Sequence, residues 1–103
     1  ALAEGLGLSA ADMQEVLDDG AMASPMVKLK GPLMTQSKYP SAFPLKYALK
    51  DMRFALGLPE AGTLDLAVSE SATAAFAAAA DEEGLGDSDF AAVMEVARRA
   101  ARA

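Results

Sequence analysis

Residues 45–56 read Leu45-Lys-Tyr-Ala-Leu-Lys-Asp-Met-Arg-Phe-Ala-Leu56, and they form the most regular helical pattern in the chain. Apolar side chains recur here three or four positions apart, which places them on one face of an α-helix. Gly57-Leu-Pro59 follows and is typical of a helix end. We therefore predict a helix over 45–56 with one buried apolar face. That face consists of Leu45, Ala48, Leu49, Met52, Ala55 and Leu56.

The start of the chain predicts two helices joined by a tight turn. Residues 1–8 read as the last turns of a helix with Gly7 as its C-cap, and Ser9 caps a second helix that ends at Gly20. The turn also matches G-x-G-x-x-A from Gly5, which in a dinucleotide-binding fold lets a pyrophosphate approach a helix N-terminus. Because that motif has to follow a strand and here follows helical sequence, we interpret it as one helix end running into the next helix start.

The next segment predicts one helix and a loop bounded by prolines. Ser24-Pro25 combines a capping side chain with proline at the first helical position. Gly31-Pro32 is expected to kink or break this helix, because proline lacks an N–H and its ring crowds the preceding turn. Residues 36–44, which contain Pro40 and Pro44, are expected to form a loop.

Two further helices are expected in the C-terminal half. Ala is the best helix former, so the Ala-rich segment 64–83 predicts a long helix with Val68 and Phe76 as its larger buried side chains. Asp87 or Ser88 is expected to cap the last helix. The buried face of that helix is predicted to contain Phe90, Val93, Met94 and Ala97.

The composition favours an all-α protein of one small domain. The chain has 103 residues, of which 52% are hydrophobic, and Ala supplies much of that fraction. Strand-forming residues are scarce, since Ile and Trp are absent and there are two Tyr. We expect about five or six short helices and no strand.

Several kinds of chemistry are excluded by what the sequence lacks. With no Cys and no His, a disulfide, a thiol nucleophile, an imidazole base and a zinc site of the usual kind are all impossible. The acids at 81–83, Asp87 and Asp89 do not have the spacing of a calcium loop, and we interpret them as a solvated helix end without a metal. No apolar run has the length of a membrane span, so no membrane contact is expected.

Charge is concentrated in one basic segment of an acidic chain. The net charge is −6, yet residues 20–59 contain six bases and a single acid, Asp51. This distribution suggests a local anion site rather than a nucleic-acid surface. Lys46, Lys50 and Arg53 share one face of the 45–56 helix and suit a phosphate or carboxylate. The alternative is an ordinary solvated polar face.

Two other residues of this region have alternative interpretations. Asp51 either forms a surface ion pair with a neighbouring cation or contacts a substrate hydroxyl. Phe43 either lines a pocket or anchors the loop to the core.

Five runs of sequence carry a resemblance to a known family. They resemble the C-terminal domain of the β-hydroxyacid dehydrogenases, the 3-hydroxyisobutyrate dehydrogenase-like family, and the resemblance covers nearly the whole chain. Within that family they are most similar to the plant-type glyoxylate/succinic semialdehyde reductases. The runs are Gly20-Ala-Met-Ala-Ser-Pro-Met26, Lys30-Gly-Pro32, Ala42-Phe-Pro-Leu-Lys46, Lys50-Asp-Met-Arg-Phe-Ala-Leu56 and Gly84-Leu-Gly-Asp-Ser-Asp-Phe90-Ala-Ala-Val93.

The resemblance implies a fold and a function. Residues 1–103 would form a 6-phosphogluconate dehydrogenase C-terminal-like helical bundle, with an N-terminal Rossmann domain absent from this chain. The family reduces small aldehyde acids such as glyoxylate and succinic semialdehyde with NADPH or NADH, bound mainly by the Rossmann domain. Lys50 would contact the cofactor, and Phe43 and Asp51 would border the substrate cleft. The family's catalytic lysine has no match in this chain, so the fragment alone is expected to be inactive.

The resemblance also implies partners and a compartment. We expect a homo-oligomer or a part of a larger assembly, in the cytoplasm or in an organelle matrix such as that of a plastid or mitochondrion. The alternative is a non-catalytic helical interaction module derived from the same family. A third possibility, an acidic ligand-binding bundle unrelated to dehydrogenases, is disfavoured by the number of matched positions.

Overall fold

A computed structural model describes residues 1–102 of the chain and the side chains of residues 1–99. The predicted all-α fold is confirmed, because the described residues form α-helices and short 3-10 helices and contain no strand beyond an isolated bridge between Pro44 and Asp89. In chain order the elements are α1 (Leu2–Gly5), α2 (Ala10–Asp18), α3 (Pro25–Gln36), α4 (Leu45–Leu56), η1 (Pro59–Thr63), α5 (Ala67–Asp81), η2 (Phe90–Val93) and α6 (Met94–Arg102).

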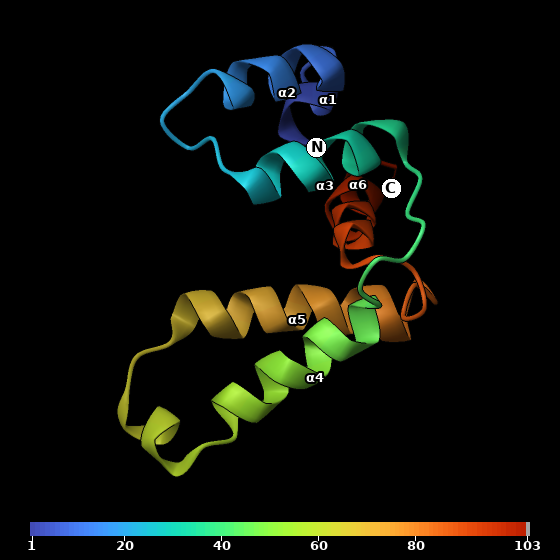
Figure 1. Cartoon of the computed structure of the whole chain (residues 1–103). Coiled ribbons are helices and arrows are strands. Elements are labelled where there is room, and N and C mark those ends of the chain that lie inside the picture. The colour runs from blue at the N-terminus through green and yellow to red at the C-terminus, as the bar shows by residue number, and fades with distance from the viewer. Residues whose placement is uncertain (103) are drawn as a thin grey trace.

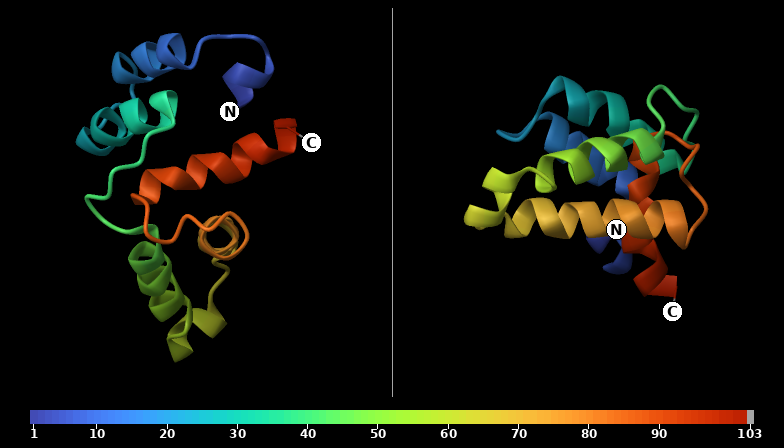
Figure 2. Two further views of the ribbon diagram at one scale, coloured as in Figure 1. Left: turned by 90° about the vertical axis from the view of Figure 1, so that its right-hand side faces the viewer. Right: turned by 90° about the horizontal axis from the view of Figure 1, so that it is seen from below.

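The helices form two groups with α6 between them (Figure 1). α1, α2 and α3 make up one group, α4 and α5 lie against each other in the second, and η2 contacts both α3 and α4. The left view of Figure 2 shows α6 crossing the space between the groups. The radius of gyration, 14.6 Å, exceeds the value of about 13 Å typical of a compact domain of this length. The two groups therefore leave more surface uncovered than a closed bundle would.

α4 begins and ends where its apolar pattern predicts. Leu45 and Leu49 are buried, and they face the elements that follow in the chain. Ala79 of α5 and Ala92 of η2 pack with Leu45 in the centre of the core, and their small side chains allow close approach of the helix backbones. Of the predicted apolar face only Ala55 is exposed.

The first two helices also follow their sequence signals. Gly7 follows Leu6, the C-cap of α1, and adopts a positive φ of 80°, as expected for the glycine that ends a helix. The Ser9 hydroxyl accepts a hydrogen bond from the Asp12 N–H and caps α2. The interpretation of the glycine motif as a helix end followed by a helix start is confirmed.

α3 does not break at Gly31-Pro32, so the expectation that these two residues could end the helix was wrong. The helix continues to Gln36, with Pro32 exposed in its interior. Proline removes one backbone donor but has a helical φ, and the close packing of Gly31 against α2 supports the helix here. A Cβ at position 31 would lie 1.9 Å from the Gln14 side-chain oxygen, so only glycine fits the contact without displacing Gln14.

The last helix differs from the prediction in the residue at which it starts and in the side chains that it buries. Asp89, rather than Asp87 or Ser88, is the N-cap, and its carboxylate accepts from the Ala91 N–H. The helix begins as η2 and only then continues as α6. A 3-10 helix has three residues per turn rather than 3.6, which rotates the buried face of the turns that follow. Ala97 is consequently exposed and Val96 is half-buried against the core.

α5 is shorter than the predicted segment 64–83. It starts at Ala67, because the Asp65 carboxylate accepts from the Ala67 N–H and Leu64 is extended. Phe76 packs against the core as predicted, whereas Val68 is 85% exposed. Among the described residues, we find no helix whose length and hydropathy would suit a membrane span.

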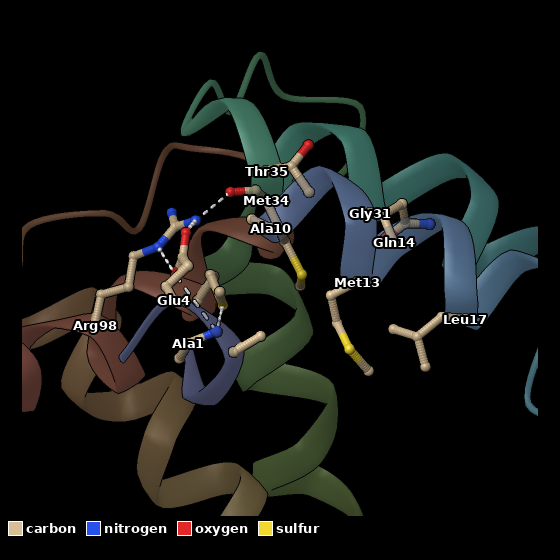
Figure 3. A pocket seen from close by; sticks show the side chains of 12 residues that line it. Ala1, Glu4, Ala10, Met13, Gln14, Leu17, Gly31, Met34, Thr35 and Arg98 are labelled. Atoms are coloured by element: carbon tan, nitrogen blue, oxygen red, sulfur yellow. Dashed lines mark hydrogen bonds and ion pairs between the residues drawn. The ribbon is translucent and has the colours of Figure 1, made fainter. Parts of the chain in front are cut away.

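Arg98 joins α6 to the first group of helices. Its guanidinium donates to both carboxylate oxygens of Glu4, at 3.0 and 2.7 Å, and to the Met34 carbonyl at 2.7 Å. The hydrogen bond from Arg98 holds the pKa of Glu4 below its usual range. Beside this cluster lies an apolar pocket of about 220 Å³, into which Met13 and Met34 project (Figure 3).

The core packing around α4 leads to a test of stability. Leu45→Ala removes a side chain with no exposed surface, and such a change should lower the free energy of unfolding by about 2–5 kcal/mol. Val68→Ala, at an exposed position of α5, is the control and should leave it nearly unchanged. Urea unfolding followed by circular dichroism measures both. Equal effects of the two changes would contradict this core.

Candidate functional site

The three predicted site residues lie just before α4 and in its middle turns. Phe43 is in the loop just before the helix, and Lys50 and Asp51 are in its middle turns. All three are on the surface, with Phe43 42% exposed and Lys50 57% exposed. Tyr47 lies between them, because its position is four residues after Phe43 and three before Lys50.

Aromatic rings and ammonium groups alternate along this face of α4. The rings of Phe43 and Tyr47 meet edge to face with centroids 6.3 Å apart. The Lys50 ammonium lies 5.9 Å from the Tyr47 ring centroid and 5.8 Å from that of Phe54. Lys46 also approaches Tyr47, at 5.4 Å. We call this row the aromatic–lysine face. It consists of Phe43, Lys46, Tyr47, Lys50 and Phe54.

The cations on α4 all have exposed acidic partners. Lys46 bonds to Asp87 at 2.5 Å, and this hydrogen bond raises the pKa of Lys46. Lys50 pairs with Asp51 at 3.3 Å, so Asp51 takes part in a surface ion pair. Exposed pairs of this kind contribute little free energy, and an anionic ligand can replace the acid at small cost. Arg53 approaches Asp81 to 3.8 Å in the same way.

Asp89 is the buried acid of this region, and sequence reasoning missed it. It has no exposed surface, although the sequence suggested a solvated helix end there. The Lys30 ammonium donates to its two carboxylate oxygens at 2.9 and 3.1 Å. Three backbone N–H groups also donate to it, from Ala42 at 3.1 Å, Phe43 at 3.2 Å and Ala91 at 3.0 Å. Lys30 and Asp89 are 59 positions apart, so no local pattern signals their contact.

The ionised form of Asp89 is favoured despite its burial. Burial opposes ionisation, but the hydrogen bonds from Ala91, Lys30, Phe43 and Ala42 outweigh it and hold the pKa of Asp89 below its usual range. A buried acid that is hydrogen-bonded in this way is a fixed negative charge between α3, the Phe43 loop and η2.

The segment around Asp89 also holds the start of α4. Asp89 donates its N–H to the Tyr39 carbonyl at 3.0 Å, and Phe90 donates to the Phe43 carbonyl at 3.1 Å. The Leu45 and Lys46 N–H groups, which have no partner within the helix, donate to carbonyls of residues 88 and 86 at 2.9 Å. The aromatic–lysine face is therefore built on backbone that is fixed at its N-terminal end.

Comparison with known proteins assigns the chain to a class that binds a nicotinamide cofactor. The family model for the NAD-binding part of NADP-dependent 3-hydroxyisobutyrate dehydrogenase matches residues 1–97. The chain belongs to this family, which is the wider family that its sequence motifs resemble.

Two individual proteins from Arabidopsis thaliana match almost the whole chain. Glyoxylate/succinic semialdehyde reductase 1 is 47% identical over 97 residues, which are 94% of this chain and 33% of the relative. The chloroplastic glyoxylate/succinic semialdehyde reductase 2 is 42% identical over 99 residues, which are 96% of this chain and 27% of the relative. The chain thus spans a third or less of the length of these relatives.

The burial of Asp89 leads to a test of stability and its pH dependence. Asp89→Asn leaves Lys30 without a counter-charge and should lower the free energy of unfolding at neutral pH by about 3–5 kcal/mol. A carboxyl whose pKa is lowered by folding stabilises the protein above its unfolded pKa, about 3.9, and this contribution is lost as the pH falls through the folded value. The variant should therefore lose less stability on acidification than the wild type, as measured by urea unfolding at several pH values.

The control for this test is Asp87→Asn, because Asp87 is 88% exposed. It should leave both the stability and its acid dependence almost unchanged. If Asp89→Asn behaved like this control, the buried ion pair would not be the constraint that the geometry indicates.

Proposed function

We propose that the chain is the helical cofactor- and substrate-facing part of an NAD(P)-dependent reductase of small aldehyde acids. Glyoxylate and succinic semialdehyde would be reduced to the corresponding hydroxyacids. Membership of the NAD-binding family and the names of the two relatives support this function. The structural observation that carries it is the aromatic–lysine face, where the Lys50 ammonium lies between two exposed rings.

The donor set of this face fits a nicotinamide cofactor. Such a cofactor combines negatively charged phosphates with planar rings, and the face combines ammonium groups with exposed aromatic side chains. Lys50 would donate a charge-assisted hydrogen bond to the bound cofactor, in exchange for its exposed pair with Asp51. When bound, the cofactor supplies the hydride for the reduction.

The substrate would lie along the same face, bordered by Phe43 and by Asp51. The half-exposed ring of Phe43 offers an apolar wall that excludes water from the aldehyde. The Asp51 carboxylate would accept a hydrogen bond from a hydroxyl of the substrate or product. Lys46 places a positive charge on this face, which favours a substrate that carries a carboxylate.

The remaining parts of the enzyme would lie elsewhere in the full-length protein. Residues 1–103 would be one helical domain, and a Rossmann domain outside this chain would bind most of the cofactor. The catalytic lysine would also lie outside it, so the chain alone would not turn over substrate. The name of one relative places that protein in the chloroplast, and we infer a cytoplasmic or organelle-matrix location for the present one.

A second candidate function is that of a non-catalytic interaction module. The observation that favours it is a set of exposed apolar side chains in and between α1 and α2, since large exposed apolar surfaces usually contact another protein. Self-association through these helices would suit a reductase as well as a module. NADPH consumption by the full-length protein with glyoxylate separates the two functions, because a module would show none. The set includes Leu2, Leu6, Leu8 and Met13, which line one surface hollow.

The role of Lys50 can be measured directly in the full-length protein. Lys50→Ala should weaken NADPH binding by about 1.5–3 kcal/mol, the free energy of a lost hydrogen bond to a charged group. Lys28→Ala removes a charge from an exposed position of α3 and should leave the affinity nearly unchanged. Fluorescence titration with NADPH gives both dissociation constants, and an unaltered affinity of the Lys50 variant would rule out this cofactor contact.

A further inference from the structure

The two oxygens of the Asp89 carboxylate accept hydrogen bonds from two different segments of the chain. Oδ1 accepts from the N–H groups of Ala42 and Phe43, and Oδ2 accepts from that of Ala91. The Lys30 ammonium bonds to both oxygens and is itself only 13% exposed. One buried charge pair therefore fixes the loop before α4 relative to the start of η2.

The position of Phe43 depends directly on this pair, in addition to the contact of its ring with Tyr47 of α4. Phe43 precedes the first residue of the helix, so no helical hydrogen bond holds it. Its N–H donates to Asp89, its carbonyl accepts from Phe90, and its ring meets the Phe90 ring with centroids 6.3 Å apart. The Lys30 ammonium in turn lies 4.4 Å from the centroid of the Phe90 ring.

Lys50 is held by different interactions. It lies in a regular turn of α4, which is anchored to the core by the buried side chains of Leu45 and Leu49. A substitution that breaks the Asp89 hydrogen bonds should therefore displace Phe43 more than it displaces Lys50.

We propose that Lys30 and Asp89 are positioning residues for the substrate site. They fix the backbone and ring of Phe43, and through Phe43 they shape the contact with the aldehyde acid. This inference rests on the proposed function. The proposed role is selective. Loss of the Lys30–Asp89 pair should raise KM for the aldehyde acid and leave the contact between Lys50 and the cofactor in place.

The ammonium of Lys30 is needed to keep both oxygens of Asp89 as acceptors. Without a counter-charge, the buried carboxylate takes up a proton more readily. One of its oxygens then becomes a hydroxyl, which is a weaker acceptor than a carboxylate oxygen, and the hydrogen bond to the backbone N–H on that side is weakened. Arginine at position 30 keeps the positive charge, whereas methionine keeps the apolar stem without the charge.

The experiment uses the full-length protein with Lys30→Met and Lys30→Arg. We expect Lys30→Met to raise KM for the aldehyde acid about 10- to 100-fold, as a displaced substrate-positioning group does. The dissociation constant for NADPH should be nearly unchanged, and Lys30→Arg should recover most of the lost KM. An unchanged KM in Lys30→Met, or an equal loss of NADPH affinity, would overturn the proposal.

A destabilising change outside this network is the matched control. Ser9→Ala removes the hydroxyl that accepts a hydrogen bond from the Asp12 N–H and caps α2, and loss of such a cap is destabilising. It should lower the temperature of unfolding and leave KM unchanged. A rise in KM equal to that of Lys30→Met would show that lower stability, and not the position of Phe43, causes the effect.

A second readout does not depend on turnover. The NMR cross-peak between the ring protons of Phe43 and Phe90 should be present in the wild type and weakened in Lys30→Met. Absence of NADPH-dependent turnover in the wild type would reject the proposed function alone. An undiminished cross-peak in Lys30→Met would reject the positioning role alone.

Discussion

A carboxylate that is removed from water destabilises a protein unless hydrogen bonds and a counter-charge replace its hydration. Asp89 receives five such hydrogen bonds, from the ammonium of Lys30 and from three backbone N–H groups. The donors come from α3, from the loop before α4 and from η2. The two groups of helices in Figure 1 therefore share one buried charge, and their relative placement depends on it.

The outward face of α4 follows from this constraint and from the core. Leu45 and Leu49 point inward against α5 and η2, which leaves Tyr47, Lys50 and Phe54 on the opposite side. The Asp89 network fixes the N-terminal end of the same helix. A rigid helix that presents alternating rings and ammonium groups is suited to an extended ligand with phosphates and planar rings, such as a nicotinamide cofactor.

The sequence predicts local features of this fold better than its long-range contacts. The bounds of α4 were predicted to the residue, because its apolar periodicity and the following Gly57-Leu-Pro59 are local signals. The exposure of Val68 was not predicted, since an Ala-rich helix has no distinct apolar face to show which side is covered. Asp89 was placed in a solvated run of acids for a similar reason: its partner is 59 positions away. The assignments of Phe43, Lys50 and Asp51 came from family resemblance, whereas the residues alone indicated a basic stripe.

The central claim is that the buried Asp89 carboxylate fixes the backbone on which the site is built. Amide hydrogen exchange in the wild-type protein tests it most directly, because the N–H groups of Ala42 and Phe43 lie outside helices and have the Asp89 carboxylate as their acceptor. The account predicts that these two amides exchange about as slowly as the core amides of α4. Exchange at the rate of an exposed loop would contradict it.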